Sequence, residues 1–136
     1  MLAAMIMGAE GVQVGSRFVA SEEASSHLNF KQAVISAQEG DTVLTLKQLT
    51  PVRLIRNKFY EAVQEAELKG ATSDELLTLL GRARAKKGMF EGNLDEGELE
   101  IGQVSALIKD ILPAGVILKN MWAEFSEALK QPLRNQ

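Results

Sequence analysis

The feature that most constrains the fold is one short strand-like run near the start of the chain, followed almost entirely by helical patterns. Residues 11–15 read Gly-Val-Gln-Val-Gly and directly follow a run of helical propensity, Met1 to Ala9, that ends at Gly8. Thr42 to Leu46 is a weaker strand candidate. Because a lone strand cannot satisfy its own backbone N–H and C=O groups, the pattern predicts the end of a larger α/β fold.

Behind this run, apolar residues recur at three-and-four spacing, which predicts a succession of helices. The predicted helices span about His27 to Gln38, Pro51 to Gly70, Thr72 to Gly88, Ile101 to Ile111 and Pro113 to Pro132. Thr72 and Glu75 fit a capping box. No repeat or linker divides the chain, so residues 1–136 are expected to form one unit. Within it, residues 1–40 hold the strand, a loop and the next helix, and residues 41–136 form a helical region.

Composition and charge exclude several classes of function. The formal net charge is -3, so there is no general positive field to attract nucleic acid, and no nucleic-acid partner is expected. The chain has no cysteine and one histidine, which excludes disulfides, thiolate catalysis and multi-histidine metal sites. The apolar run Met1 to Met7 lacks a basic flank and is too short to span a bilayer. We therefore expect no membrane segment and a cytoplasmic location.

The segment with the clearest chemical potential is Gln13, Val14, Gly15 and Ser16. Glycine lets backbone N–H groups approach an anion, and a serine hydroxyl adds another donor, as phosphate sites require. In (β/α)8 barrels such sites follow strands seven and eight. A plain tight turn explains the same residues equally well, so the motif alone leaves both interpretations open.

A resemblance to a known family favours the phosphate site. The run GAEGVQVGSRFVASEEASSH resembles the strand-eight region of the nitronate monooxygenase family, formerly called 2-nitropropane dioxygenase, which includes flavin-dependent enoyl-acyl-carrier-protein reductases. The likeness continues through PVRLIRNKFYEA, GRARAKKGMFEGNLDEGELEIGQVSALI and the final helix. It implies the C-terminal part of an FMN-binding (β/α)8 TIM barrel in which Gln13, Val14, Gly15 and Ser16 contact the flavin phosphate, chiefly through backbone amides. The family's catalytic histidine and strand-seven glycine pair are expected upstream of Met1, so no catalytic residue is assigned here.

The activity that the resemblance implies is that of an FMN-dependent oxidoreductase, in which the flavin carries the redox chemistry. Oxidation of alkyl nitronates by oxygen is preferred over reduction of an enoyl thioester with a nicotinamide cofactor. Another phosphate-binding barrel, of the inosine-monophosphate dehydrogenase type, has a similar strand, but the helices after Gly40 do not resemble it. A non-catalytic helical fragment is the alternative from another class, and it would bind a partner or a second copy through its apolar stripes.

Other conspicuous residues have structural explanations. His27 is expected to cap a helix, and basic residues near a helix end complement its dipole: Arg82, Arg84, Lys86 and Lys87. Acidic residues are expected in a solvated loop with ordinary pKa values: Asp95, Glu96, Glu98 and Glu100. Trp122 and Phe125 are expected in a core or interface. Gly102 and Gln103 either lie near the flavin or allow close helix packing, and Arg53 and Arg56 either clamp an anion or form surface ion pairs.

Overall fold

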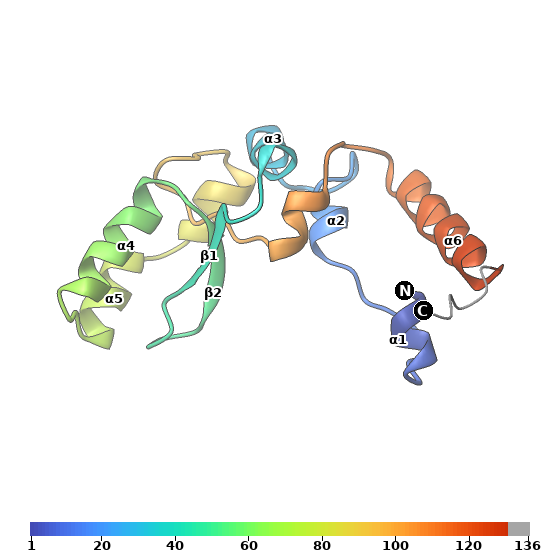
Figure 1. The fold of residues 1–136 in the computed structure, drawn as a ribbon. Coiled ribbons are helices and arrows are strands. Elements are labelled where there is room, and N and C mark those ends of the chain that lie inside the picture. Colours follow the sequence, from blue (N-terminus) through green and yellow to red (C-terminus); the bar gives the residue numbers. More distant parts are fainter. Residues whose placement is uncertain (131–136) are drawn as a thin grey trace.

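The computed structural model describes residues 1–130, which form an arch (Figure 1). The elements in chain order are α1 Leu2–Ile6, α2 Ser16–Val19, α3 Leu28–Ser36, β1 Thr42–Thr45, β2 Val52–Ile55, α4 Lys58–Leu68, α5 Ser73–Leu80, a π-helical turn Lys86–Phe90, a 3-10 turn Gln103–Leu107 and α6 Ala114–Lys130. The β1–β2 hairpin with α4 and α5 forms one end of the arch, α2 and α3 lie in the middle, and α1 with α6 forms the other end.

The strand predicted at residues 11–15 is wrong, because this segment is irregular backbone in the structure. The two-stranded sheet of the described residues lies elsewhere, at β1 and β2, so residues 11–15 have no strand beside them to complete a ladder. The short helix α1 before them ends as predicted, with Gly8 at a φ of 97°. Residues 11–15 therefore connect α1 to α2 without forming a strand.

The hairpin confirms one predicted strand and corrects the predicted start of one helix. Thr42–Thr45 forms β1 and pairs antiparallel with Val52–Ile55, with Thr42 opposite Ile55 and Thr45 opposite Val52. The sequence predicted a helix from Pro51, but that helix, α4, begins only at Lys58, where the Asn57 side chain accepts a hydrogen bond from Tyr60 N–H. Val52 to Ile55 is rich in β-branched residues and short, so three-residue spacing and strand alternation both fit it.

A second predicted helix is much shorter in the structure, and extended backbone precedes it. Residues 98–101 run beside β2: Ile55 N–H donates to Leu99 C=O at 3.0 Å, and Ile101 N–H donates to Arg53 C=O at 3.1 Å. The sequence Glu98-Leu99-Glu100-Ile101 alternates polar and apolar residues, which is typical of a strand. The helix predicted from Ile101 to Ile111 is therefore reduced to the 3-10 turn.

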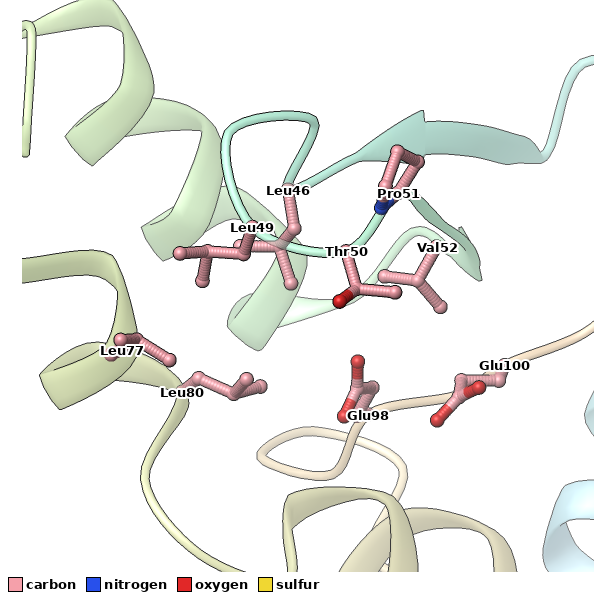
Figure 2. A pocket seen from close by; sticks show the side chains of 9 residues that line it. All are labelled: Leu46, Leu49, Thr50, Pro51, Val52, Leu77, Leu80, Glu98 and Glu100. Carbon is pink, nitrogen blue, oxygen red and sulfur yellow. The ribbon is translucent and has the colours of Figure 1, made fainter. Parts of the chain in front are cut away.

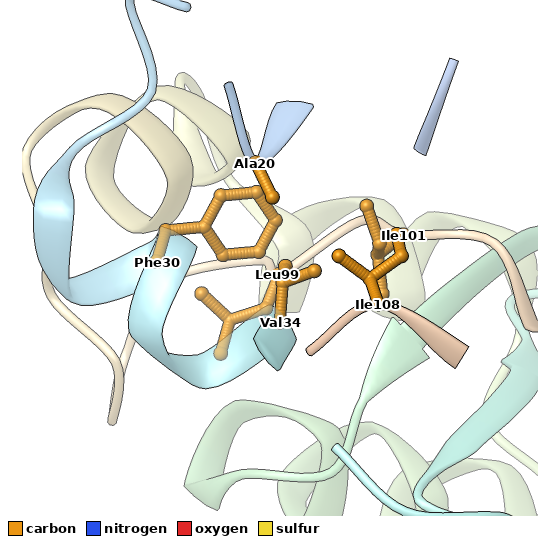
Figure 3. Close-up of a cluster of buried hydrophobic side chains, with 6 residues drawn as sticks. All are labelled: Ala20, Phe30, Val34, Leu99, Ile101 and Ile108. Atoms are coloured by element: carbon orange, nitrogen blue, oxygen red, sulfur yellow. The ribbon is translucent and has the colours of Figure 1, made fainter. Parts of the chain in front are cut away.

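Two hydrophobic clusters stabilise the arch, one in its middle and one at its hairpin end. The first packs α3 against residues 99–108 and comprises Ala20, Phe30, Val34, Leu99, Ile101 and Ile108 (Figure 3). The second lies between the hairpin and helices α4 and α5, and comprises Leu46, Leu54, Phe59, Val63 and Leu76. Alternation along residues 98–101 sends Leu99 and Ile101 into the first cluster and leaves their acidic neighbours on the other side.

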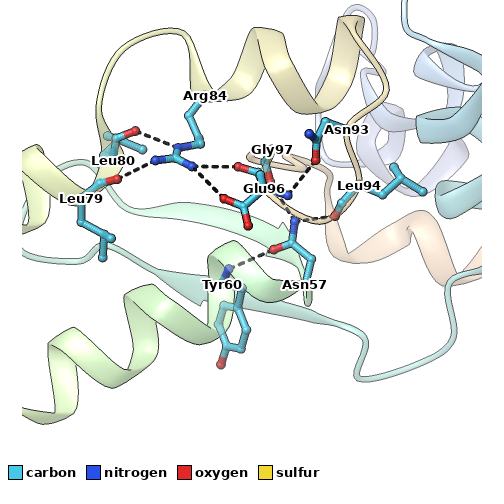
Figure 4. Close-up of polar contacts among 9 residues, drawn as sticks. All are labelled: Asn57, Tyr60, Leu79, Leu80, Arg84, Asn93, Leu94, Glu96 and Gly97. Carbon is cyan, nitrogen blue, oxygen red and sulfur yellow. Dashed lines mark hydrogen bonds and ion pairs between the residues drawn. The ribbon is translucent and has the colours of Figure 1, made fainter.

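A close backbone crossing joins the π-helical turn to residues 95–100, which we call the acidic loop. A Cβ atom added to Gly97 would lie 2.1 Å from the Cα atom of Gly88, so only glycine allows this approach. The Asn57 amide donates to the carbonyls of Leu94 and Gly97, each at 2.8 Å (Figure 4). Gly88 was expected as a helix C-cap, but it is a packing residue, and α5 ends earlier, at Leu80.

The side chain of Arg84 donates hydrogen bonds to the last backbone carbonyls of α5. Its guanidinium donates to Leu79 C=O at 2.9 Å and to Leu80 C=O at 3.0 Å (Figure 4), and it lies over the ring of Phe59. It also lies 3.7 Å from the Glu96 carboxylate. The prediction that basic residues complement a helix end is thus confirmed for Arg84.

The helices with clear local signals are confirmed. His27 accepts a hydrogen bond from Asn29 N–H at 3.1 Å and caps α3, and both bonds of the Thr72–Glu75 capping box are present at the start of α5. The last helix, α6, runs from Ala114 to Lys130; its predicted end at Pro132 lies outside the described residues. Phe125 is buried as expected, whereas Trp122 is exposed.

Candidate phosphate-binding loop and cavity

The loop before α2 carries free backbone donors. Gly15 is the N-cap of α2, and Ser16 is its first residue. Among residues 1–130, the N–H groups of Gln13, Val14, Gly15 and Ser16 donate to no recorded protein acceptor. Gln13 and Gly15 are exposed and Val14 and Ser16 are half-buried, so all four N–H groups are open to an acceptor, which an anion at a helix start provides. The loop is therefore chemically suited to a phosphate.

A contact between distant segments fixes the Ser16 hydroxyl. Gly102 N–H donates to Ser16 Oγ at 3.1 Å, although the two residues are 86 positions apart. A Cβ atom added to Gly102 would lie 2.6 Å from that oxygen. Gly102 thus permits a close approach, which is one of the two interpretations of the Gly102–Gln103 pair, while the role of Gln103 stays a prediction. Since Ser16 Oγ accepts this bond, its own O–H remains able to donate to an anion.

An open cavity of about 390 Å³ lies beside Ser16. Its lining residues come from α2, β2 and the segment beside β2: Gly15, Ser16, Val19, Pro51, Val52, Arg53, Glu100, Ile101 and Gly102. The structure therefore brings two of the four predicted site residues, Gly15 and Ser16, to one cavity. Val14 lines a neighbouring apolar cavity of about 210 Å³ against α6, and Gln13 lines neither.

The cavity also has a positive charge that sequence reasoning left out of the site. Arg53 lines it, and its guanidinium donates to Thr42 C=O at 2.9 Å, which fixes the side chain across the hairpin. Alternation along β2 places Arg53 on the face opposite the buried Leu54, and this pattern could have identified it. Arg17, by contrast, pairs with the Asp110 carboxylate and donates to Asp110 C=O at 3.0 Å. Arg53, not Arg17, is the cation that faces the cavity.

Other kinds of site find no support in the part of the chain that the structure describes. Residues 1–130 contain no group of three or more His, Cys, Asp or Glu side chains arranged to hold a metal ion. None of the described helices is both long and apolar enough to cross a membrane. The single histidine, His27, serves as a helix cap.

The fold and the loop together define a mixed α/β chain with free backbone N–H groups beside a cavity. The family model described as nitronate monooxygenase matches residues 1–124. The chain therefore belongs to the nitronate monooxygenase family, whose members are flavin-dependent.

Individual relatives agree with this assignment. A probable nitronate monooxygenase of Staphylococcus saprophyticus is 29% identical over 96% of this chain and 37% of its own length. One from Bacillus subtilis is 34% identical over 80% of this chain and 32% of its own. The chain thus spans about a third of the length of these two curated relatives.

Solved structures show the same relationship. FabK from Thermotoga maritima superposes with a TM-score of 0.86 at 34% identity, covering 95% of this chain and 41% of that protein. A nitroalkane oxidase from Streptomyces ansochromogenes gives a TM-score of 0.66 at 28% identity, covering 93% of this chain and 36% of that protein. The prediction of a barrel fragment is confirmed as far as a mixed α/β chain that matches part of the FabK TIM barrel.

Proposed function

We propose that this chain is the part of an FMN-dependent oxidoreductase that holds the flavin phosphate, through Gln13, Val14, Gly15 and Ser16. The observation that carries the proposal is the set of free N–H groups at residues 13–16, next to the Ser16 hydroxyl at the cavity. A phosphate accepts several such bonds at once, and charge-assisted hydrogen bonds are stronger than neutral ones.

Each residue has a distinct part in this proposal. The backbone N–H groups and the Ser16 O–H donate to phosphate oxygens, and Gly102 orients the hydroxyl by donating to its oxygen. Arg53 lines the same cavity and adds a positive charge, although the Glu100 carboxylate lines it too. Bound FMN would supply the redox chemistry, and these residues would bind and orient it.

The activity that we propose for the complete protein is oxidation of alkyl nitronates by oxygen. Membership of the nitronate monooxygenase family and the names of the curated relatives support it. Reduction of an enoyl thioester with a nicotinamide cofactor is the second candidate, because the TM-score to FabK, 0.86, exceeds that to the nitroalkane oxidase, 0.66. The third candidate, a helical fragment that associates with a partner, has its basis in the exposed apolar residues of α6.

The test uses the natural gene product that contains these residues. After purification, its extracted flavin is identified, and oxygen uptake is measured with propyl-2-nitronate. Oxidation of the reduced nicotinamide cofactor is measured separately with a crotonyl thioester. We expect bound FMN and nitronate-dependent oxygen uptake. A colourless protein that takes up no FMN would contradict the flavin proposal, and thioester-dependent cofactor oxidation alone would select the second candidate.

A further inference from the structure

The acidic loop contains two carboxylates that strand alternation places on one side of the chain. Residues 98–101 run beside β2 as extended backbone, and Glu100 forms an isolated bridge with Leu54. Successive side chains of extended backbone point to opposite faces. Leu99 and Ile101 enter the first hydrophobic cluster, so Glu98 and Glu100 face the other way.

These two carboxylates line a cavity of about 270 Å³ that adjoins the cavity beside Ser16, and Glu100 lies on the wall between the two. Figure 2 shows both side chains along one edge, with Thr50 opposite Glu98 and leucines from the hairpin and α5 around it. The full lining is Leu46, Leu49, Thr50, Pro51, Val52, Leu77, Leu80, Glu98 and Glu100. Apolar walls thus surround a pair of negative charges.

Glu98 is the unusual member of this pair. It is only 8% exposed, projects into the cavity, and within residues 1–130 its carboxylate has no recorded hydrogen-bond or ion-pair partner. Burial raises the pKa of Glu98, and the nearby Glu100 carboxylate raises it further, whereas Arg84 acts in the opposite direction. Although the residue is largely buried, its carboxylate oxygens stay accessible from the cavity, where they can accept hydrogen bonds from a bound cation.

We propose that this cavity binds a small primary alkylammonium ion, with the ammonium head between Glu98 and Glu100 and the alkyl chain against Leu46, Leu77 and Leu80. The two carboxylates and the Thr50 hydroxyl accept from the three ammonium hydrogens. The leucines cover the methylene groups, as apolar walls do for the stem of a lysine.

The chemistry of the site distinguishes this ligand from a metal ion. Calcium takes six to eight oxygen ligands, and the described residues offer no metal-like cluster here. A volume of about 270 Å³ lies just below the range of drug-sized ligand pockets, which matches a short amine. Neither Gly15 nor Ser16 lines this cavity, and Glu98 lines this cavity alone, whereas Glu100 also borders the cavity beside Ser16.

The test compares n-butylamine with the neutral 1-butanol by calorimetric titration of the natural gene product that contains this chain, at pH 7.5. We expect butylammonium to bind at least about ten-fold more tightly than butanol, because a head group paired with a buried carboxylate contributes well over 1.4 kcal/mol. Equal affinities, or no measurable binding of the amine, would overturn the proposal.

Three variants assign the binding to this cavity. Glu98→Gln and Glu100→Gln should each weaken butylammonium binding by about ten-fold or more and leave butanol unaffected. Glu61→Gln, which removes the same charge from the exposed face of α4, should change neither. Amide NMR shifts of the unaltered chain should move at Thr50, Leu77 and Glu98 and stay constant at Gly15 and Gly102. Unchanged amine binding in both cavity variants, or shifts confined to Gly15 and Gly102, would contradict the assignment.

Discussion

Two regions of this chain differ sharply in how far their apolar residues are buried. In residues 16–112, which we call the packed region, Phe30, Leu54 and Leu76 are completely inaccessible to solvent. In residues 1–15 together with α6, which we call the terminal pair, α1 buries no residue, Ile6 is 70% exposed and Trp122 is 61% exposed. Hydrophobic spacing therefore identifies the apolar face of an element, but the face is buried only where another element covers it.

The terminal pair still makes contacts of its own. Met1, Val12 and Val14 line a cavity of about 210 Å³ with Leu118 and Trp122, so α6 lies close to the segment before α2. Within α6, only Ile117 and Phe125 are buried. The packed region should therefore carry most of the folding free energy, and the terminal pair little of it.

The largest expected effect comes from truncating a buried aromatic side chain in the packed region. Phe30→Ala should lower the free energy of unfolding by about 3–5 kcal/mol, because it removes a fully buried ring and leaves a cavity in the first cluster. Trp122→Ala, the matched change in the terminal pair, should cost under about 1 kcal/mol since most of that side chain is already in water. Urea unfolding followed by circular dichroism measures both, and equal losses would break the distinction between the regions.

Replacing a glycine by alanine should change stability differently in the two regions, because the backbone is closely packed at Gly97 and not at Gly115. Gly97→Ala should destabilise the chain by about 1–3 kcal/mol, because its Cβ would lie 2.1 Å from the Cα of Gly88. Gly115→Ala, in α6, meets no atom within 4 Å and should be neutral or slightly stabilising. Thermal unfolding of the two variants checks this, and tolerance of alanine at position 97 would show that the crossing of the two backbones is not tightly packed.

The capping box of α5 should have an intermediate effect. Thr72→Ala removes the side-chain acceptor for Glu75 N–H, at 3.3 Å, and should cost about 1 kcal/mol. Thr78→Ala, in the same helix, removes only a bond from the hydroxyl to Asp74 C=O and should be close to neutral. Urea midpoints measure both changes. If the Thr78 variant lost as much stability as the Thr72 variant, the cap would have no special role.

The smallest expected effect concerns Glu98 and depends on pH. Its pKa is raised in the folded chain by burial and by Glu100, with Arg84 opposing, so the folded state binds this proton more readily than the unfolded state. The free energy of unfolding should therefore fall as pH rises from about the ordinary value of 4.5 through the raised pKa. Glu98→Gln should remove that decline and raise the melting temperature at pH 7 but not at pH 4. An equal gain at both pH values would rule out titration of Glu98 as the cause.

Local signals in the sequence predicted several elements correctly. His27 before α3, the Thr72–Glu75 box before α5 and the apolar stripe of α6 each depend on residues within about two turns. Strands were harder to predict, because they depend on distant partners. Residues 11–15 have strand-like composition without a neighbouring strand, whereas β2 gains both β1 and residues 98–101 as neighbours.

The candidate site was predictable to a similar extent. Gly15 and Ser16 follow from the requirements of a phosphate loop, and the structure places both at the cavity. Side-chain alternation along β2 and along residues 98–101 could have shown that both side chains point away from their buried leucine neighbours: Arg53 from Leu54, and Glu98 from Leu99. The contact of Ser16 with Gly102 could not have been predicted from spacing, since it joins segments 86 residues apart.

The measurement that tests the phosphate assignment most directly compares the affinities of FMN and riboflavin for the natural protein and its Ser16→Ala variant, by quenching of flavin fluorescence. The two flavins differ only in the phosphate. If residues 13–16 hold that phosphate, FMN should bind at least about ten-fold more tightly than riboflavin, and Ser16→Ala should narrow this ratio by weakening FMN alone. Equal affinities of the two flavins, or a ratio unchanged by Ser16→Ala, would contradict the assignment.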